Sequence, residues 1–182
     1  DVAAAVIGCN ADIGLAFDGD GDRCGVVDNR GQEIFADKVG VLLARDIAAR
    51  HSNARFVVDV KSTGLFMTDP LLKQLGASTD YWKTGHSYIK RRVNDLDALV
   101  GFEKSGHFFF NAPLGRGYDD GLVAALAVCD MLDRNPGRSI GELNEDLPKT
   151  WGSPTMSAHC PDEIKYAVAD RVKQQIEQMA AA

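Results

Sequence analysis

The middle of the chain alternates short apolar segments that have the pattern of strands with segments that have the pattern of helices. The expected strands are residues 55–60, 78–82 and 98–102, and the expected helices between them are residues 65–75 and 87–93. Strands that alternate with helices at this spacing predict an α/β domain, in which a mixed sheet is flanked by helices. Because ligand-binding loops of such domains lie at strand ends, we expect a functional site there.

Segments before and after this alternation have patterns of their own. Asp37 is expected to cap a long amphipathic helix, and Ser139 with Glu142 forms a capping box that opens a short one. The other expected elements are strands at residues 13–17, 24–28, 33–35 and 107–110, and a helix at residues 119–134.

The composition changes around residues 147–154, where the α/β pattern ends. An extended segment is expected at residues 155–159 and a helix from Pro161. Since a lone amphipathic helix needs a partner surface, this segment reads as the start of a further domain. The apolar residues of the helix recur at every fourth position, as Ile164, Val168, Val172, Ile176 and, one position early, Met179.

We therefore expect three pieces, residues 1–36, 37–146 and 147–182. The middle piece is expected to be a complete domain, and the outer two are expected to be incomplete parts of the preceding and following domains. The chain begins with Asp1 rather than Met, which also favours a fragment of a longer protein.

Composition excludes several classes of function. The net charge is −6, from 20 basic and 26 acidic side chains, which argues against general binding to nucleic acid or anionic membranes. No secretory leader is visible, and the longest apolar stretches fall short of the ~20 residues that cross a membrane. The four cysteines show no CxxC pair and no metal-finger spacing, so we expect reduced thiols in a cytoplasmic protein.

The sequence Asp18-Gly19-Asp20-Gly21-Asp22-Arg23 follows the first expected strand. Three carboxylates at alternate positions of one loop repel one another unless a cation neutralises them. The two glycines let the backbone curl so that three oxygens can converge, and Mg²⁺ accepts such ligands. The loop therefore predicts a magnesium site, with a solvated acidic turn as the simpler alternative.

Two other kinds of acidic loop share part of this pattern. An EF-hand needs Gly at its sixth position and Glu at its twelfth, where this chain has Arg23 and Asn29, so an EF-hand is excluded. A haloacid-dehalogenase-type phosphotransferase has the pattern DxDx[TV] with the first aspartate as nucleophile. Asp18 and Asp20 fit that pattern, although Asp22 stands where Thr or Val belongs, so this enzyme class remains an alternative.

A second loop, residues 101–107 (GFEKSGH), follows the strand at residues 98–102. Glu103 and Ser105 would lie on one side of an extended loop, where they suit paired hydrogen bonds with sugar hydroxyls. His107 can donate or accept a proton near neutral pH. Taken alone, the segment is weak evidence for a site, because a glutamate on a loop is usually solvated and a single histidine is usually structural.

Together, FDGDGDR at residues 17–23 and the loop at residues 101–107 resemble the α-D-phosphohexomutase superfamily, which contains phosphoglucomutases and phosphomannomutases, and the bacterial phosphomannomutases most of all. The resemblance covers nearly the whole chain, although Phe102 replaces a glycine common in the family. The resemblance implies that Asp18, Asp20 and Asp22 bind Mg²⁺ and that Arg23 lies beside the transferring phosphoryl group. It also implies that Glu103 and Ser105 bind sugar hydroxyls and that His107 is the general acid/base.

Two further segments agree with this resemblance. Residues 60–64 end a strand and open a helix, and Lys61 there could reach an anionic oxygen. Residues 83–90 resemble the family's sugar-facing loop, with His86 in the contacting place. In both cases a simpler explanation remains, namely a surface lysine and a residue that begins a helix.

The resemblance also implies a reaction. A phosphohexomutase interconverts hexose 1-phosphates and hexose 6-phosphates, here of mannose or glucose, through a phosphoserine and a bisphosphate intermediate. The family carries the serine in its first domain and a phosphate-binding loop in its fourth. Neither motif occurs here, since residues 155–161 match the serine loop in composition only. We therefore expect a fragment without mutase activity of its own; a non-catalytic module that binds sugar phosphate or metal remains the alternative from another class.

Overall fold

The computed structural model describes residues 1–152 and 159–180, so the extended segment expected at residues 155–159 lies almost wholly outside the described residues. The chain forms two compact units, Asp1–Thr150 and Trp151–Ala182. Within the described ranges, no helix is both long and apolar enough to cross a membrane.

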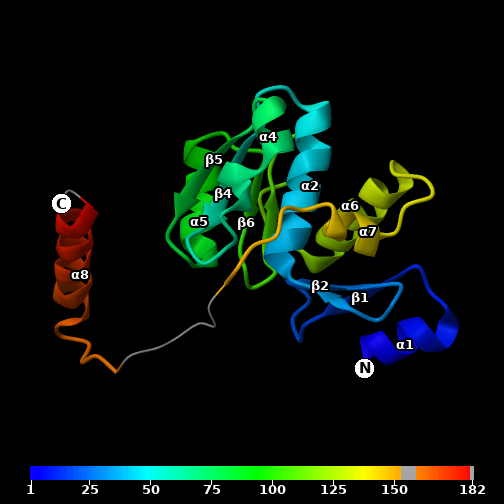
Figure 1. Cartoon of the computed structure of the whole chain (residues 1–182), viewed down its shortest axis with the longest axis horizontal. Coiled ribbons are helices and arrows are strands. Elements are labelled where there is room, and N and C mark those ends of the chain that lie inside the picture. The colour runs from blue at the N-terminus through cyan, green and yellow to red at the C-terminus, as the bar shows by residue number, and fades with distance from the viewer. Residues whose placement is uncertain (153–158, 181–182) are drawn as a thin grey trace. The chain divides into compact units, whose positions relative to one another are not determined.

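The larger unit is built on a four-stranded mixed sheet (Figure 1). Its strands are β4 (Arg55–Asp59), β5 (Ser78–Trp82), β6 (Val100–Phe102) and β7 (Phe108–Phe110), in the order β5-β4-β6-β7. β4 pairs in parallel with β5 and β6, and β7 pairs antiparallel with β6. The expected mixed sheet is confirmed, with its two later strands shorter than predicted.

Helices cover both faces of this sheet. Successive residues of a strand point to opposite faces, so one strand contributes to the packing on each. Phe56 and Val58 of β4 belong to the main core with helix α2 (Ala36–Arg50). Val57 between them packs in a smaller cluster with Ile89 and Val93 of helix α5 (His86–Asp95). The predicted arrangement of a sheet flanked by helices is therefore confirmed.

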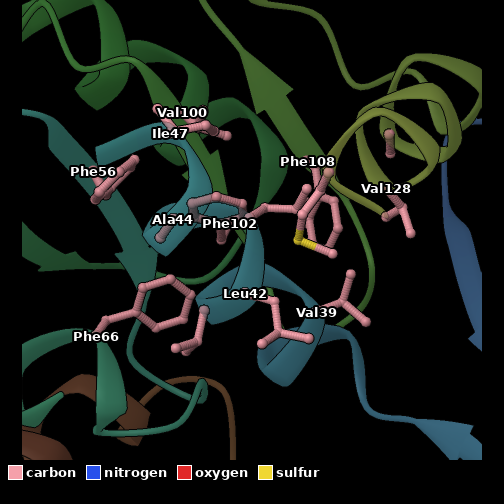
Figure 2. Packing of buried hydrophobic residues seen from close by; sticks show 14 of the residues in the cluster. Val39, Leu42, Ala44, Ile47, Phe56, Phe66, Val100, Phe102, Phe108 and Val128 are labelled. Carbon is pink, nitrogen blue, oxygen red and sulfur yellow. The ribbon is translucent and has the colours of Figure 1, made fainter. Parts of the chain in front are cut away.

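Phe102 lies at the centre of the main core (Figure 2). Its fully buried ring contacts the rings of Phe56, Phe66 and Phe108, at centroid distances of 5.9, 5.3 and 5.3 Å. A Cβ at Gly40 of α2 would lie 3.1 Å from this ring, so the glycine lets the helix approach the sheet closely. The residue that departs from the family pattern is thus a core residue.

Two helical predictions need correction. Residues 65–75 form two helices, α3 (Leu65–Thr68) and α4 (Pro70–Gln74), because Pro70 lacks an N–H and Asp69 instead caps α4 by accepting a hydrogen bond from Leu72 N. α2 begins at Ala36 without a side-chain cap, and the carboxylate of Asp37 accepts a hydrogen bond from Thr63 N at 2.8 Å.

A three-stranded antiparallel sheet precedes this domain within the same unit. It consists of β1 (Ile13–Phe17), β2 (Cys24–Asp28) and β3 (Glu33–Ile34), with β2 in the middle. Helix α1 (Val2–Cys9), which the sequence analysis did not predict, packs on β1 and β2 and is capped by the Asp1 side chain.

The remaining helices are α6 (Gly121–Asp133), α7 (Ile140–Glu145) and α8 (Lys165–Ala180). α7 begins with the predicted capping box of Ser139 and Glu142. α8 lies in the smaller unit and has no buried residue, so its apolar stripe is exposed within the described part of that unit. It begins at Lys165, four residues after the predicted start.

Candidate active site

Three loops meet at one edge of the mixed sheet. The parallel strands β4, β5 and β6 end at Asp59, Trp82 and Phe102, and the chain continues from them into residues 60–64, 83–86 and 103–107. We call these the first, second and third loops. Parallel strands bring loops that are distant in sequence to the same edge, where ligands of α/β proteins bind. Four of the expected substrate residues and His107 lie on these loops.

Glu103 is buried and holds the third loop against the second. Its Oε1 accepts a hydrogen bond from Gly85 N at 2.6 Å, and its Oε2 lies 3.1 Å from Nδ1 of His107. Ser105 Oγ lies 2.8 Å from the same nitrogen. Both carboxylate oxygens of Glu103 therefore face protein groups, and Ser105, which is exposed, is the more accessible of the pair.

His107 connects the third loop to the acidic loop. Its Nε2 lies 3.4 Å from Oδ2 of Asp22, and its backbone forms an antiparallel bridge with Arg23. The imidazole stacks on Phe109 at a centroid distance of 6.2 Å. The imidazole thus has a carboxylate near each ring nitrogen, with Glu103 on one side and Asp22 on the other.

The three aspartates of the acidic loop converge as the sequence predicted. One carboxylate oxygen from each of Asp18, Asp20 and Asp22 lies within 4.8 Å of the others. Gly21 between them has φ +76°, a conformation that glycine adopts readily. Oδ1 of Asp22 is buried and has no hydrogen-bond partner within the described residues. An unpaired buried carboxylate oxygen beside two other carboxylates fits the ligand set of a hard divalent cation.

The guanidinium of Arg23 lies against the carboxylates of its own loop. Its Nε lies 2.5 Å from Oδ2 of Asp18 and 3.8 Å from Oδ1 of Asp22. Desolvation alone would raise the pKa of Asp18, but hydrogen bonds and charge from Arg23 outweigh it and lower that pKa to about 2. Asp18 is therefore ionised at neutral pH, as a cation ligand must be.

The start of α6 lies directly on the acidic loop. Gly121 N donates to the carbonyl of Gly21 at 3.0 Å, and a Cβ at Gly121 would lie 2.7 Å from the carbonyl oxygens of Gly21 and Arg23. Only glycine permits this approach. Asp120 caps α6 by accepting hydrogen bonds from the backbone amides of Leu122 and Val123.

Asp119, the first residue of the helix expected at residues 119–134, lies outside α6 and forms an ion pair with Lys90 at 2.7 Å. One of its oxygens also lies within 4.8 Å of ligand atoms of Asp22 and His107. The sequence analysis gave Asp119 no chemical role, and its position directly before the helix cap offered no signal for one.

Lys61 and His86 lie on the first and second loops, as expected. Both are exposed, and His86 is the first residue of α5. Among the described residues neither side chain forms a hydrogen bond or an ion pair, so both are accessible at this edge. Sequence analysis missed Asp59, whose buried carboxylate accepts hydrogen bonds from all three loops. An aspartate that ends a buried apolar strand was the signal.

The chain is similar to known proteins over most of its length. Residues 35–151 match the family described as "Phosphoglucomutase/phosphomannomutase, alpha/beta/alpha domain III". A "Phosphomannomutase/phosphoglucomutase" from Pseudomonas putida is 36% identical over 173 residues, which are 95% of this chain and 36% of that protein. A "Phosphoglucomutase" from Neisseria gonorrhoeae is 39% identical over 162 residues, 89% of this chain and 34% of that protein.

A solved structure shows the same fold. The crystal structure of a phosphoglucomutase/phosphomannomutase family protein from Burkholderia thailandensis matches with a TM-score of 0.76 and 36% sequence identity. The match covers 85% of this chain and 32% of the solved one. The chain thus spans about a third of the length of the curated relatives that it matches.

Proposed function

Because this chain belongs to the phosphoglucomutase/phosphomannomutase family, we propose that it supplies the metal-binding loop and the sugar-binding loops of a phosphohexomutase. The whole enzyme would interconvert a hexose 1-phosphate and a hexose 6-phosphate. The observation that carries this proposal is the position of His107, which lies between Asp22 of the acidic loop and Glu103 of the third loop. A group suited to move a proton therefore lies where the two loops meet.

In this proposal Asp18, Asp20 and Asp22 hold Mg²⁺. The bound ion would offset negative charge on the transferring phosphoryl group. Arg23, whose guanidinium lies beside these carboxylates, would contact the same phosphoryl group. The match of the ligand set rests on the convergent carboxylates and on the unpaired oxygen of Asp22.

The three loops would bind the hexose phosphate. Lys61 and His86 are exposed at the sheet edge and can contact the anionic phosphate or a ring oxygen. Ser105 would bind a sugar hydroxyl directly. Glu103 would bind a second hydroxyl with a lone pair that its bonds to Gly85 and His107 leave open.

The proposed reaction needs a phosphoserine that this chain does not carry. A phosphoryl group would pass from that serine to the hexose phosphate, and the other phosphoryl group of the bisphosphate would return to the serine. His107 would take the proton of the attacking hydroxyl and return it in the second step. Because no serine loop of the family occurs in the sequence, we propose that the chain has no mutase activity alone.

A coupled assay tests this proposal, with mannose 1-phosphate or glucose 1-phosphate, Mg²⁺ and a catalytic amount of hexose bisphosphate. The full-length enzyme is expected to turn over and the 182-residue chain is expected not to. Sustained turnover by the isolated chain would contradict the proposal. In that case loss of turnover in Asp18→Asn, together with a phosphorylated Asp18 in the parent, would favour the dehalogenase-type mechanism.

The non-catalytic alternative makes a different prediction for the full-length protein. A binding module would bind hexose phosphate without turnover in the same assay. Nε of Arg23 lies 2.5 Å from Oδ2 of Asp18, so the dehalogenase-type alternative would need Asp18 to attack through its other carboxylate oxygen.

A further inference from the structure

Asp59 is a buried carboxylate at the centre of the candidate site that the proposed mechanism does not use. It is the last residue of β4, and only 1% of it is exposed. Its Oδ1 accepts hydrogen bonds from Ser62 Oγ at 2.5 Å and from Lys104 N at 3.2 Å. Its Oδ2 accepts one from Thr84 Oγ1 at 3.1 Å.

Each of these three donors belongs to a different loop. Ser62 lies on the first loop beside Lys61, Thr84 lies on the second loop two residues before His86, and Lys104 lies on the third loop. A single side chain is therefore hydrogen-bonded to every loop that carries an expected substrate residue.

The chemistry of this arrangement couples the loops to one another. A buried carboxylate is stabilised only by the groups that replace its lost water, and here these are two hydroxyls and one backbone N–H. Among the described residues no cation pairs with Asp59, so a displaced donor is not compensated by a long-range charge. Displacement of one loop therefore weakens the site that holds the other two.

We propose that Asp59 is a positioning residue that fixes the three loops relative to one another, so that Lys61, His86 and the third loop face one ligand. The nature of that ligand, a hexose phosphate, rests on the proposed function. Asp59 itself is enclosed by the loops that it holds and is not expected to touch the ligand.

Amide hydrogen exchange of the 182-residue chain, followed by NMR, tests this proposal with one reporter in each loop. The reporters are the backbone amides of Ser62, Gly85 and Lys104, which donate to Asp59 O, Glu103 Oε1 and Asp59 Oδ1. In Asp59→Ala all three are expected to exchange about tenfold faster, because each loop loses its hydrogen bond to the Asp59 carboxylate, from Ser62 Oγ, Thr84 Oγ1 and Lys104 N. Thr63 N, which donates to Asp37, is expected to change least.

Conservative variants keep the test decisive if the alanine variant does not fold. Asp59→Asn keeps the shape and one carbonyl acceptor, so an intermediate increase of about fivefold is expected. Thr84→Val removes only the donor of the second loop and should release Gly85 more than Ser62. The matched control is Asp69→Asn, another fully buried carboxylate, which binds Arg45 and caps α4 away from this edge.

A purely structural role predicts a different pattern. Global destabilisation accelerates the three reporters and a core amide such as that of Val57 by the same factor, which is the result expected for Asp69→Asn. The same uniform pattern in both Asp59 variants, or unchanged exchange of the reporters, would overturn the proposal.

Titration with mannose 6-phosphate separates this inference from the proposed function. If the parent chain binds the sugar phosphate, Asp59→Asn should bind it about fivefold more weakly, and equal affinity would overturn the role in ligand binding. If the full-length protein neither binds nor turns over a hexose phosphate, the proposed function fails, and the exchange pattern of the 182-residue chain still decides whether Asp59 couples the loops.

Discussion

The antiparallel sheet presents its carboxylates on the loop after β1, and the mixed sheet presents Asp59 and Glu103 at the ends of β4 and β6. In the acidic loop the carboxylates face one another, and Oδ1 of Asp22 is buried without a hydrogen-bond partner in the described structure. At the mixed sheet, both carboxylates are buried and every oxygen has a protein partner.

This difference separates two uses of the same functional group. Carboxylates that face one another repel, and the single guanidinium of Arg23 offsets only part of the charge of three of them, so they are suited to binding a cation. Carboxylates surrounded by donors are stabilised in one geometry, so they are suited to positioning. His107 contacts one member of each set, so the residue that we propose transfers protons lies at the boundary between them.

The largest expected effect follows from removing that boundary residue. In the full-length enzyme, His107→Ala should reduce kcat by ~10²–10⁴-fold, the usual loss for a general acid/base. The control is His51→Ala, at the end of α2 and outside the site. Steady-state assays measure both variants, and unchanged turnover in His107→Ala would show that His107 is structural.

Neutralising one carboxylate of each set should lower the free energy of unfolding by different amounts. Without Mg²⁺, Glu103→Gln should lower the free energy of unfolding by about 1–3 kcal/mol, because Gly85 N and His107 lose a charged acceptor. Asp20→Asn should change it by less than about 0.5 kcal/mol, since Asp20 is exposed and its charge is repelled by its neighbours. Urea unfolding of the chain measures both, and equal losses would break the comparison.

Magnesium should stabilise the chain through the carboxylates of the acidic loop. At a Mg²⁺ concentration about ten times its dissociation constant, the parent chain should gain about 1.4 kcal/mol of stability. Asp22→Asn should gain less, because it removes the buried oxygen that lacks a partner. Asp12→Asn, an exposed aspartate directly before β1, is the control. Titration calorimetry that finds the same Mg²⁺ affinity in Asp22→Asn and the parent would refute the metal site.

The smallest effect concerns Asp28, a carboxylate of the antiparallel sheet that does have partners. Burial raises its pKa, but hydrogen bonds from the backbone of Gln32 and from Arg30 outweigh burial, so the pKa lies below 3.8. A lowered pKa contributes stability that is present above pH 3.8 and lost as the pH falls through the folded-state value. Asp28→Asn should therefore flatten the stability curve below about pH 4 in chemical unfolding. A curve that stays parallel to that of the parent would contradict this.

The sequence alone was sufficient for the elements with strong periodicity and for the convergence of the acidic loop. Alternating apolar residues and two glycines among three aspartates are local signals, and local signals specify local structure. Pro70 is also a local signal, and it predicts that residues 65–75 form two helices. The sequence analysis missed this signal because the apolar pattern continued across Pro70.

Only the tertiary structure decided which groups meet. The contact of His107 with Asp22 and the docking of Gly121 on Gly21 join segments that are far apart in the chain. The three donors of Asp59 come from loops that β4, β5 and β6 bring to one edge. Strand order and helix packing set these distances, and residue spacing does not encode them. The sequence thus predicted which chemical groups the proposed site contains, and the sheet decided which of them lie together.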